Sequence, residues 1–125
     1  MTRNNGKVLP MQVVYHSFTG NCKRFAQALD SDALSIKELP ITEEDILLIF
    51  PTVGFGQVPP AVKRYLQTNR EHIKFVVSSG NRNWGPNFAK GADVVTQHLG
   101  IPSYKIELAG TAEDVENVKK QIATL

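Results

Sequence analysis

The stretch Met11-Gln12-Val13-Val14-Tyr15-His16-Ser17-Phe18-Thr19-Gly20-Asn21 contains the signals that decide the fold of this chain. The apolar run is typical of a strand, and the small hydroxyl residues and glycine after it precede a helix that we expect over 21–29. Such a succession gathers hydroxyl groups, loop amides and a helix N-terminus around one point. The stretch therefore predicts a strand, loop and helix that together bind an anion such as phosphate.

The spacing within this loop narrows the type of phosphate ligand. It lacks the Gly-Lys-Ser/Thr ending with which nucleoside-triphosphate loops bind phosphates and Mg²⁺, and it lacks the Gly-x-Gly-x-x-Gly of dinucleotide sites. No lysine lies within 17–21. We therefore predict a monophosphate that is held by hydroxyl groups and backbone amides.

Apolar segments of strand length alternate with amphipathic segments of helix length along the rest of the chain. The run at 46–50 is apolar throughout, as expected for a strand that is covered on both faces. Further strands are predicted at 33–39, 73–78 and 104–108, and further helices from Pro59-Pro60 onward, over 87–99 and after a Thr111 cap. This alternation predicts an α/β fold with a parallel sheet and helices on both of its faces.

Length and composition predict one domain. The chain has 125 residues, of which 42% are hydrophobic, enough for a single core. Residues 1–10 fall outside the alternating pattern, so we expect a flexible N-terminal extension followed by one domain over 11–125. No run approaches the roughly 20 apolar residues of a membrane span, and no signal peptide is recognisable, so we expect a cytoplasmic protein.

The charge of the chain argues against nucleic-acid binding, and the spacing of its cysteine and histidines argues against a metal site. The net charge is only +2 and the basic residues are scattered, which does not favour a nucleic-acid partner. Cys22 is the only cysteine, and we expect it to be a small packing residue. The three histidines lack metal-ligand spacing, so no metal site is predicted, and His16 is expected at the surface.

Three loops that follow predicted strands have unusual compositions. Ligands of open α/β sheets bind beyond the carboxyl ends of the strands, which is where these loops are expected. The loop at 17–21 is rich in hydroxyl groups, the one at 51–57 has glycines around an aromatic residue, and the one at 78–86 combines amides with the only tryptophan. Phosphate ligands, glycines and aromatic residues together favour a planar heterocycle that carries one phosphate, and flavin mononucleotide (FMN) fits best.

The candidate FMN-binding residues all lie in these three loops, and the flavin itself is expected to carry the chemistry. They are Ser17, Phe18, Thr19, Gly20, Asn21, Thr52, Val53, Gly54, Phe55, Gly56, Ser79, Gly80, Asn81, Asn83, Trp84 and Gly85. Glycines such as Gly54 and Gly56 adopt positive φ at little steric cost, so their peptides can reorient. Arg82 is expected either to be solvated or to border the flavin or a partner.

At these loops the sequence resembles a known family. The first loop is similar to the flavodoxin phosphate loop Thr/Ser-x-Thr-Gly-x-Thr, with Cys22 in place of the last threonine. The segments Thr52–Gly56, Ser79–Gly85 and Glu107–Thr111 resemble those of NrdI, the small flavodoxin-like activator of class Ib ribonucleotide reductase. The resemblance covers Met11 to Ile122 and implies a flavodoxin-like, doubly wound, five-stranded parallel sheet of order 2-1-3-4-5.

The resemblance also implies a function. A flavodoxin- or ferredoxin-type reductase would supply electrons, and the reduced FMN protein would react with O₂. The product, superoxide, would be delivered to the dimanganese site of the radical-bearing subunit NrdF. This would allow assembly of the metal and radical cofactor of that subunit.

Two other classes of function remain open from the residues alone. A general flavodoxin would shuttle electrons between a reductase and several acceptors, and its reduced form would react slowly with O₂. A non-redox binding module, similar to phosphoacceptor domains of the same topology, would need an acidic cluster at the strand ends. The predicted strands here end near Ser17, Thr52 and Ser79 instead.

Overall fold

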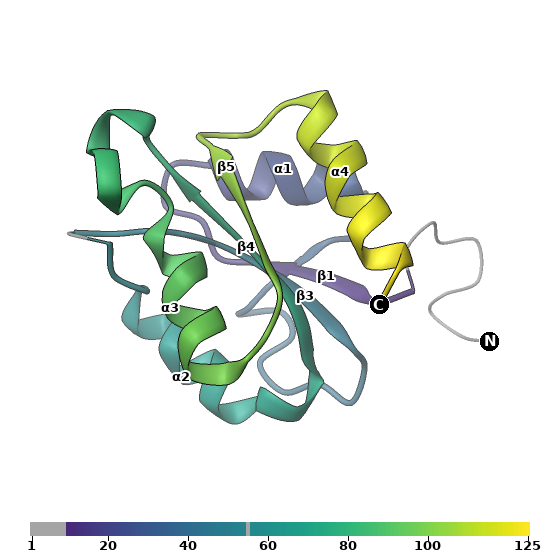
Figure 1. Cartoon of the computed structure of the whole chain (residues 1–125). Coiled ribbons are helices and arrows are strands. Elements are labelled where there is room, and N and C mark those ends of the chain that lie inside the picture. The colour runs from purple at the N-terminus through teal and green to yellow at the C-terminus, as the bar shows by residue number, and fades with distance from the viewer. Residues whose placement is uncertain (1–9, 55) are drawn as a thin grey trace.

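A five-stranded, all-parallel sheet lies at the centre of the molecule, with helices on both faces (Figure 1). The structure is a computed structural model, and it describes residues 10–54 and 56–125. The strands are β1 (Gln12–Tyr15), β2 (Leu34–Ser35), β3 (Ile46–Pro51), β4 (Ile73–Gly80) and β5 (Ser103–Glu107). The helices are α1 (Asn21–Leu29), α2 (Pro60–Thr68), α3 (Lys90–Leu99) and α4 (Ala112–Ala123), with short 3₁₀ helices η1 (Arg70–His72) and η2 (Arg82–Asn87).

The strand order is β2-β1-β3-β4-β5, which confirms the predicted flavodoxin-like fold class. After β1 the chain adds β2 on one side, and then returns to add β3, β4 and β5 on the other side. The order therefore reverses between β1 and β3, and a ligand of an open α/β sheet is expected beyond the carboxyl ends of these two strands.

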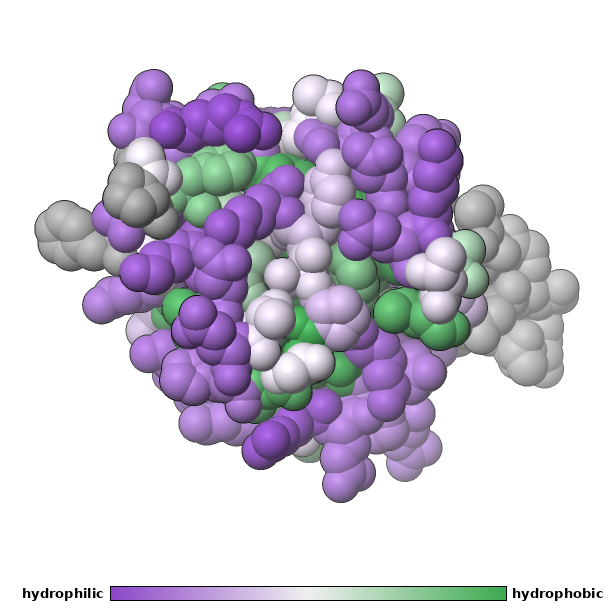
Figure 2. All heavy atoms as spheres, in the orientation of Figure 1, coloured by the Kyte–Doolittle hydropathy of each residue, from purple (hydrophilic) through white to green (hydrophobic). Residues whose placement is uncertain are grey.

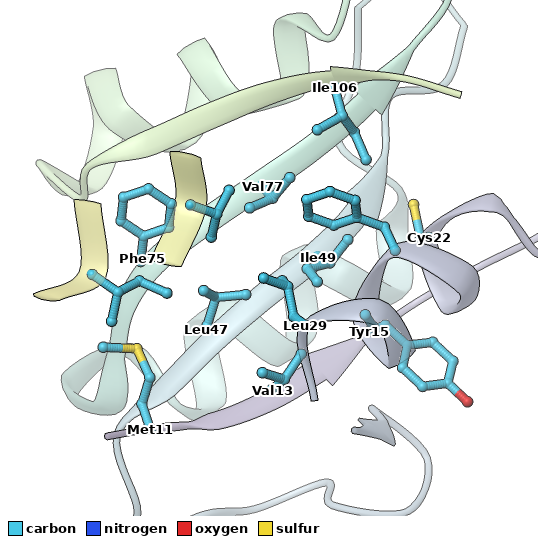
Figure 3. Close-up of a cluster of buried hydrophobic side chains, with 14 residues drawn as sticks. Met11, Val13, Tyr15, Cys22, Leu29, Leu47, Ile49, Phe75, Val77 and Ile106 are labelled. Carbon is cyan, nitrogen blue, oxygen red and sulfur yellow. The ribbon is translucent and has the colours of Figure 1, made fainter. Parts of the chain in front are cut away.

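Two apolar clusters, one on each face of the sheet, form the core. The side chains of α1 and α4 pack on one face against Leu47 and Ile49 of β3 (Figure 3). Those of α2 and α3 pack on the other face against Ile46, Leu48 and Phe50. Because β3 contributes alternate residues to both clusters, its apolar run needs no polar face, as the sequence predicted.

The structure differs from the predicted elements in two places. Only Leu34–Ser35 of the predicted strand at 33–39 pairs with β1, and the chain then turns away. The helix predicted from residue 87 begins at Lys90, because Gly85 and Ala89 have positive φ values of 58° and 47°. A helix cannot continue through such residues, so α3 starts after Ala89, and the preceding η2 consists of two short 3₁₀ turns with a kink at Gly85.

Polar side chains cover most of the face shown in Figure 2, with small apolar patches between them. No helix within the described residues is long and apolar enough to cross a membrane. Apart from the exposed Pro10, the predicted N-terminal extension lies outside the described residues.

One buried side chain, Asn69, ties the long connection between β2 and β3 to the end of α2. Its Oδ1 accepts the Thr42 N–H at 3.0 Å, and its Nδ2 donates to the carbonyls of Pro40 at 3.0 Å and Tyr65 at 3.2 Å. Asn69 is 2% exposed, so these hydrogen bonds satisfy groups that water does not reach. The connection is thereby held in place without secondary structure of its own.

We predict that Asn69→Ala lowers the free energy of unfolding by about 2 to 3 kcal/mol, because it leaves buried backbone groups of the connection unpaired. The measurement is urea unfolding followed by circular dichroism. Gln67→Ala, at an exposed position of the same helix, is the control and should change stability by less than about 0.5 kcal/mol. Equal effects of the two substitutions would contradict this role of Asn69.

Candidate functional site

The carboxyl ends of β1, β3, β4 and β5 border a cleft of about 240 Å³. Its lining residues come from the three loops singled out in the sequence, together with one residue after β5. They are Ser17, Phe18, Thr19, Asn21, Cys22, Pro51, Thr52, Val53, Ser79, Gly80, Asn81 and Leu108. None of these side chains is an acid, a lysine or an arginine, so the cleft is walled by uncharged groups.

The first loop, 17–21, leads from β1 into α1. Gly20 has φ 89° and occupies the N-cap position of α1, and no side chain caps the helix there. The Gly20 N–H donates to Ser17 Oγ at 3.0 Å, which folds the loop back on itself. The first-turn amides of an uncapped helix carry partial positive charge, and the Arg24 guanidinium donates to Asn21 Oδ1 beside them, so this end of the cleft suits an anion.

The second loop is a tight hairpin after β3. Val53 and Gln57 exchange two backbone hydrogen bonds, of 2.9 and 2.7 Å, which bring the two ends of the turn together. Gly54 and Gly56 have positive φ values of 55° and 91°, so the turn uses the conformational freedom expected of both glycines. Phe55 lies outside the described residues. Neither glycine lines the cleft, although the adjoining Val53 does.

The hydroxyl group of Thr52 has a structural role. Thr52 is 3% exposed; its Oγ1 lies 2.8 Å from Ser78 Oγ and accepts the Gly91 N–H at 3.0 Å. A Cβ at Gly91 would approach Phe50, Ser78 and Thr52 to within 3.0 Å. The hydroxyl thus fixes the first turn of α3 against the sheet. Thr52 also belongs to the lining of the cleft.

The third loop follows β4 and is tied to the end of β5. Ser79 Oγ donates to the Leu108 carbonyl at 2.6 Å, and the Leu108 N–H donates to the Gly80 carbonyl at 2.9 Å. Asn81 caps η2 through a hydrogen bond from the Asn83 N–H to its Oδ1 at 2.8 Å. The hydroxyl and amide groups predicted to contact a ligand are therefore largely engaged within the protein.

Three further residues of the third loop, Arg82, Asn83 and Gly85, do not line the cleft. Asn83 and Gly85 are exposed and do not line the cleft, and the Trp84 side chain is not among those described. Arg82 is an exposed rim residue that is neither free in solvent nor part of the lining. Its Nε lies 3.4 Å from Glu107 Oε1, and its guanidinium lies 4.7 Å from the centre of the Phe88 ring.

Sequence reasoning did not assign three of the lining residues to the cofactor site. Pro51 is the first residue of the predicted loop at 51–57, and Cys22 directly follows the loop at 17–21, so their position in the sequence was the available signal. Leu108 lies in the Glu107–Thr111 segment, which was noticed for its family resemblance but was given no role in binding. Its presence follows from the parallel sheet, because β5 ends at the same edge as β3 and β4.

Burial determines the protonation of two groups beside the cleft. Burial raises the pKa of the Cys22 thiol to about 12, so this group is neutral at physiological pH. His16, predicted at the surface, is half-buried, and its Nε2 is buried and has no hydrogen-bond partner among the described residues. Burial, with a smaller effect from Lys37, lowers the pKa of His16, and its ring lies edge-on to Phe18 with centroids 4.8 Å apart. The His16 N–H donates to the Ile49 carbonyl, which holds the residue at the end of β1.

The lining suits a flavin better than it suits a metal ion. Uncharged apolar walls fit a flat ring system, and the uncapped helix fits a phosphate group. Among the described residues, no group of three or more His, Cys, Asp or Glu side chains is placed to hold a metal ion.

A comparison with known protein families agrees with this geometry. The family model described as NrdI flavodoxin-like matches residues 13–120 of the chain. The matched region begins in β1 and ends in α4, so it includes the whole sheet and all three loops around the cleft. The chain therefore belongs to the NrdI flavodoxin-like family and is a flavoprotein of the NrdI type.

Proposed function

We propose that this protein binds FMN in the cleft and, once reduced, supplies superoxide to the dimanganese site of the ribonucleotide reductase subunit NrdF. The observation that carries the proposal is the meeting of the three loops in one uncharged cleft beside the uncapped end of α1. Membership of the NrdI family, which is associated with activation of ribonucleotide reductase, supports the choice of partner.

The residues of the first loop would hold the phosphate. The amides at the start of α1 provide donors, and the Ser17 and Thr19 hydroxyl groups line the same part of the cleft. Gly20 brings the backbone close, because its positive φ turns the chain directly into the helix. The final threonine of the flavodoxin loop is replaced by the buried Cys22, so backbone amides would carry more of the binding here.

The lining would also suit the redox step. FMN held in this cleft would supply, in its reduced form, one electron to O₂, with superoxide as the product. No carboxylate lines the cleft, so a negatively charged reduced ring is penalised less than it would be beside acidic residues. Burial keeps the Cys22 thiol neutral, and a thiol is less reactive toward oxidants than the thiolate.

The rim of the cleft would form the docking face. We propose that residues 52–57 and 81–86 contact NrdF, with a reductase of the flavodoxin or ferredoxin type supplying electrons beforehand. Phe18, 64% exposed, and Leu108, 50% exposed, add apolar surface at the mouth of the cleft. Exposed apolar side chains around a polar loop are a common composition for a protein interface.

We predict that Thr19→Asp weakens FMN binding by at least about tenfold, since a carboxylate would stand against the phosphate, whereas Thr19→Ser changes binding little. The measurement is the quenching of flavin fluorescence during titration of the apoprotein. Riboflavin, which lacks the phosphate, should lose much less affinity in Thr19→Asp. Thr68→Asp, at an exposed position at the end of α2, is the control for added charge and should bind FMN normally. Equal FMN affinity of Thr19→Asp and Thr19→Ser would remove the phosphate assignment.

We predict that Gly54→Val shifts the reduction potentials of the bound flavin while the fold is retained. Gly54 has φ 55°, and the substitution places a β-branched side chain where the hairpin requires that conformation. Spectroelectrochemical titration measures the potentials. Gly100→Val is the matched control, because Gly100 has φ 69° and open space around it but lies at the far end of α3. Unchanged potentials in Gly54→Val, or the same shift in both variants, would refute a role of this hairpin in redox tuning.

We predict that the reduced protein and O₂ together generate the active state of dimanganese NrdF. The assay mixes manganese-loaded NrdF, this protein and a reductant under O₂, and follows cofactor formation and ribonucleotide reductase activity. Superoxide dismutase should inhibit only partly, because a docked complex shields the oxidant from solvent. If an ordinary flavodoxin serves equally well, or if activation needs no flavoprotein, the proposal fails and the electron-shuttle function takes its place.

A further inference from the structure

Leu108, the residue directly after β5, has an unfavourable backbone conformation. Its φ is 53°, in the left-handed region, where a side chain crowds the following carbonyl. Ala89 is the only other non-glycine residue with positive φ among the described residues, with φ 47°. Both residues lie beside Gly80 at the end of β4: the Leu108 N–H donates to the Gly80 carbonyl, and a Cβ at Gly80 would meet the Ala89 nitrogen at 2.4 Å.

Packing explains the conformation of Ala89 but not that of Leu108. Ala89 is completely buried, at 0% exposure, and it closely approaches Gly80 where α3 joins the sheet. Leu108 is 50% exposed, so its side chain contributes little to the core. Glycine would adopt the same backbone conformation without crowding, as Gly110 does two residues later at φ 71°.

Hydrogen bonds on both sides hold Leu108 in place. Ser79 Oγ donates to its carbonyl at 2.6 Å, and its own N–H donates to the Gly80 carbonyl at 2.9 Å. The preceding residue, Glu107, accepts the Arg82 N–H at 3.2 Å and pairs with the Arg82 side chain. The residue is thus fixed to the loop after β4, and its side chain forms part of the cleft lining.

We infer that Leu108 is a flavin-binding residue, an apolar wall that contacts the ring system rather than the phosphate. The inference rests on the proposed binding of FMN in this cleft. The phosphate would bind at the start of α1, where backbone amides are available as donors, whereas Leu108 offers the cleft an apolar side chain, and its own N–H is already bonded to the Gly80 carbonyl. The part of the ligand that reaches this side is the apolar ring system, and covering it removes apolar surface from water.

The test separates the backbone conformation of Leu108 from its side chain. Leu108→Gly removes both the crowding and the wall, and Leu108→Ala removes most of the wall but keeps the crowding. We expect both variants to bind FMN and riboflavin about five- to tenfold more weakly than the unsubstituted protein, by fluorescence titration. The ratio of the two affinities should be unchanged, because the phosphate site is intact.

The stability of the flavin-free protein provides the second measurement. In urea unfolding, the Leu108→Gly apoprotein should be at least as stable as the unsubstituted apoprotein and more stable than Leu108→Ala. Ala89→Gly is the matched control: it also relieves a positive φ, but its side chain does not line the cleft. We expect Ala89→Gly to bind both flavins with unchanged affinity.

Three results would overturn the inference in distinguishable ways. If Leu108→Gly binds both flavins as tightly as the unsubstituted protein, the side chain does not contact the ring. If its apoprotein is markedly less stable, the leucine serves the fold. If the unsubstituted protein binds neither flavin, the proposed function itself is wrong, and the inference fails with it.

Discussion

The burial of β3 on both of its faces is the constraint on which the rest of the structure depends. Residues 46–50 are completely buried, and they contribute to the apolar clusters on both sides of the sheet. A strand in this position needs neighbours on both edges and helices on both faces, and parallel pairing with β1 and β4 supplies the edges. Because all strands then run in one direction, every strand-to-helix loop emerges at the same edge of the sheet, and the cleft forms there.

The walls of the cleft are connected to one another by hydrogen bonds between neighbouring strand ends. The Thr52 N–H donates to the Ser79 carbonyl, and Ser79 in turn binds Leu108 through its hydroxyl group. The loops after β3, β4 and β5 are therefore held in a fixed relation before any ligand arrives. Such preorganisation lowers the conformational cost of binding, since fewer groups must become ordered.

The sequence predicted the fold class and the location of the cleft, but not the role of each side chain. Periodicity located β3 and α1 well, because a long apolar run and a clear glycine boundary are local signals. The start of α3 was placed too early, since a positive φ at an alanine has no signature in the sequence. The structural role of the Thr52 hydroxyl was not predicted, because its buried hydrogen bond from Gly91 depends on tertiary contacts. The partial burial of His16 and the presence of Leu108 in the lining were missed for the same reason.

The hairpin after β3 is held by α3 at both of its ends. Thr52 accepts the Gly91 N–H on one side, and Gly56 on the other side packs so closely on Lys90 that a Cβ would lie 2.7 Å from its Cδ. The first turn of α3 therefore contacts both ends of the loop, at Thr52 and at Gly56. A shift of α3 would move these two ends together, which couples the position of the helix to the side of the cleft that Val53 lines.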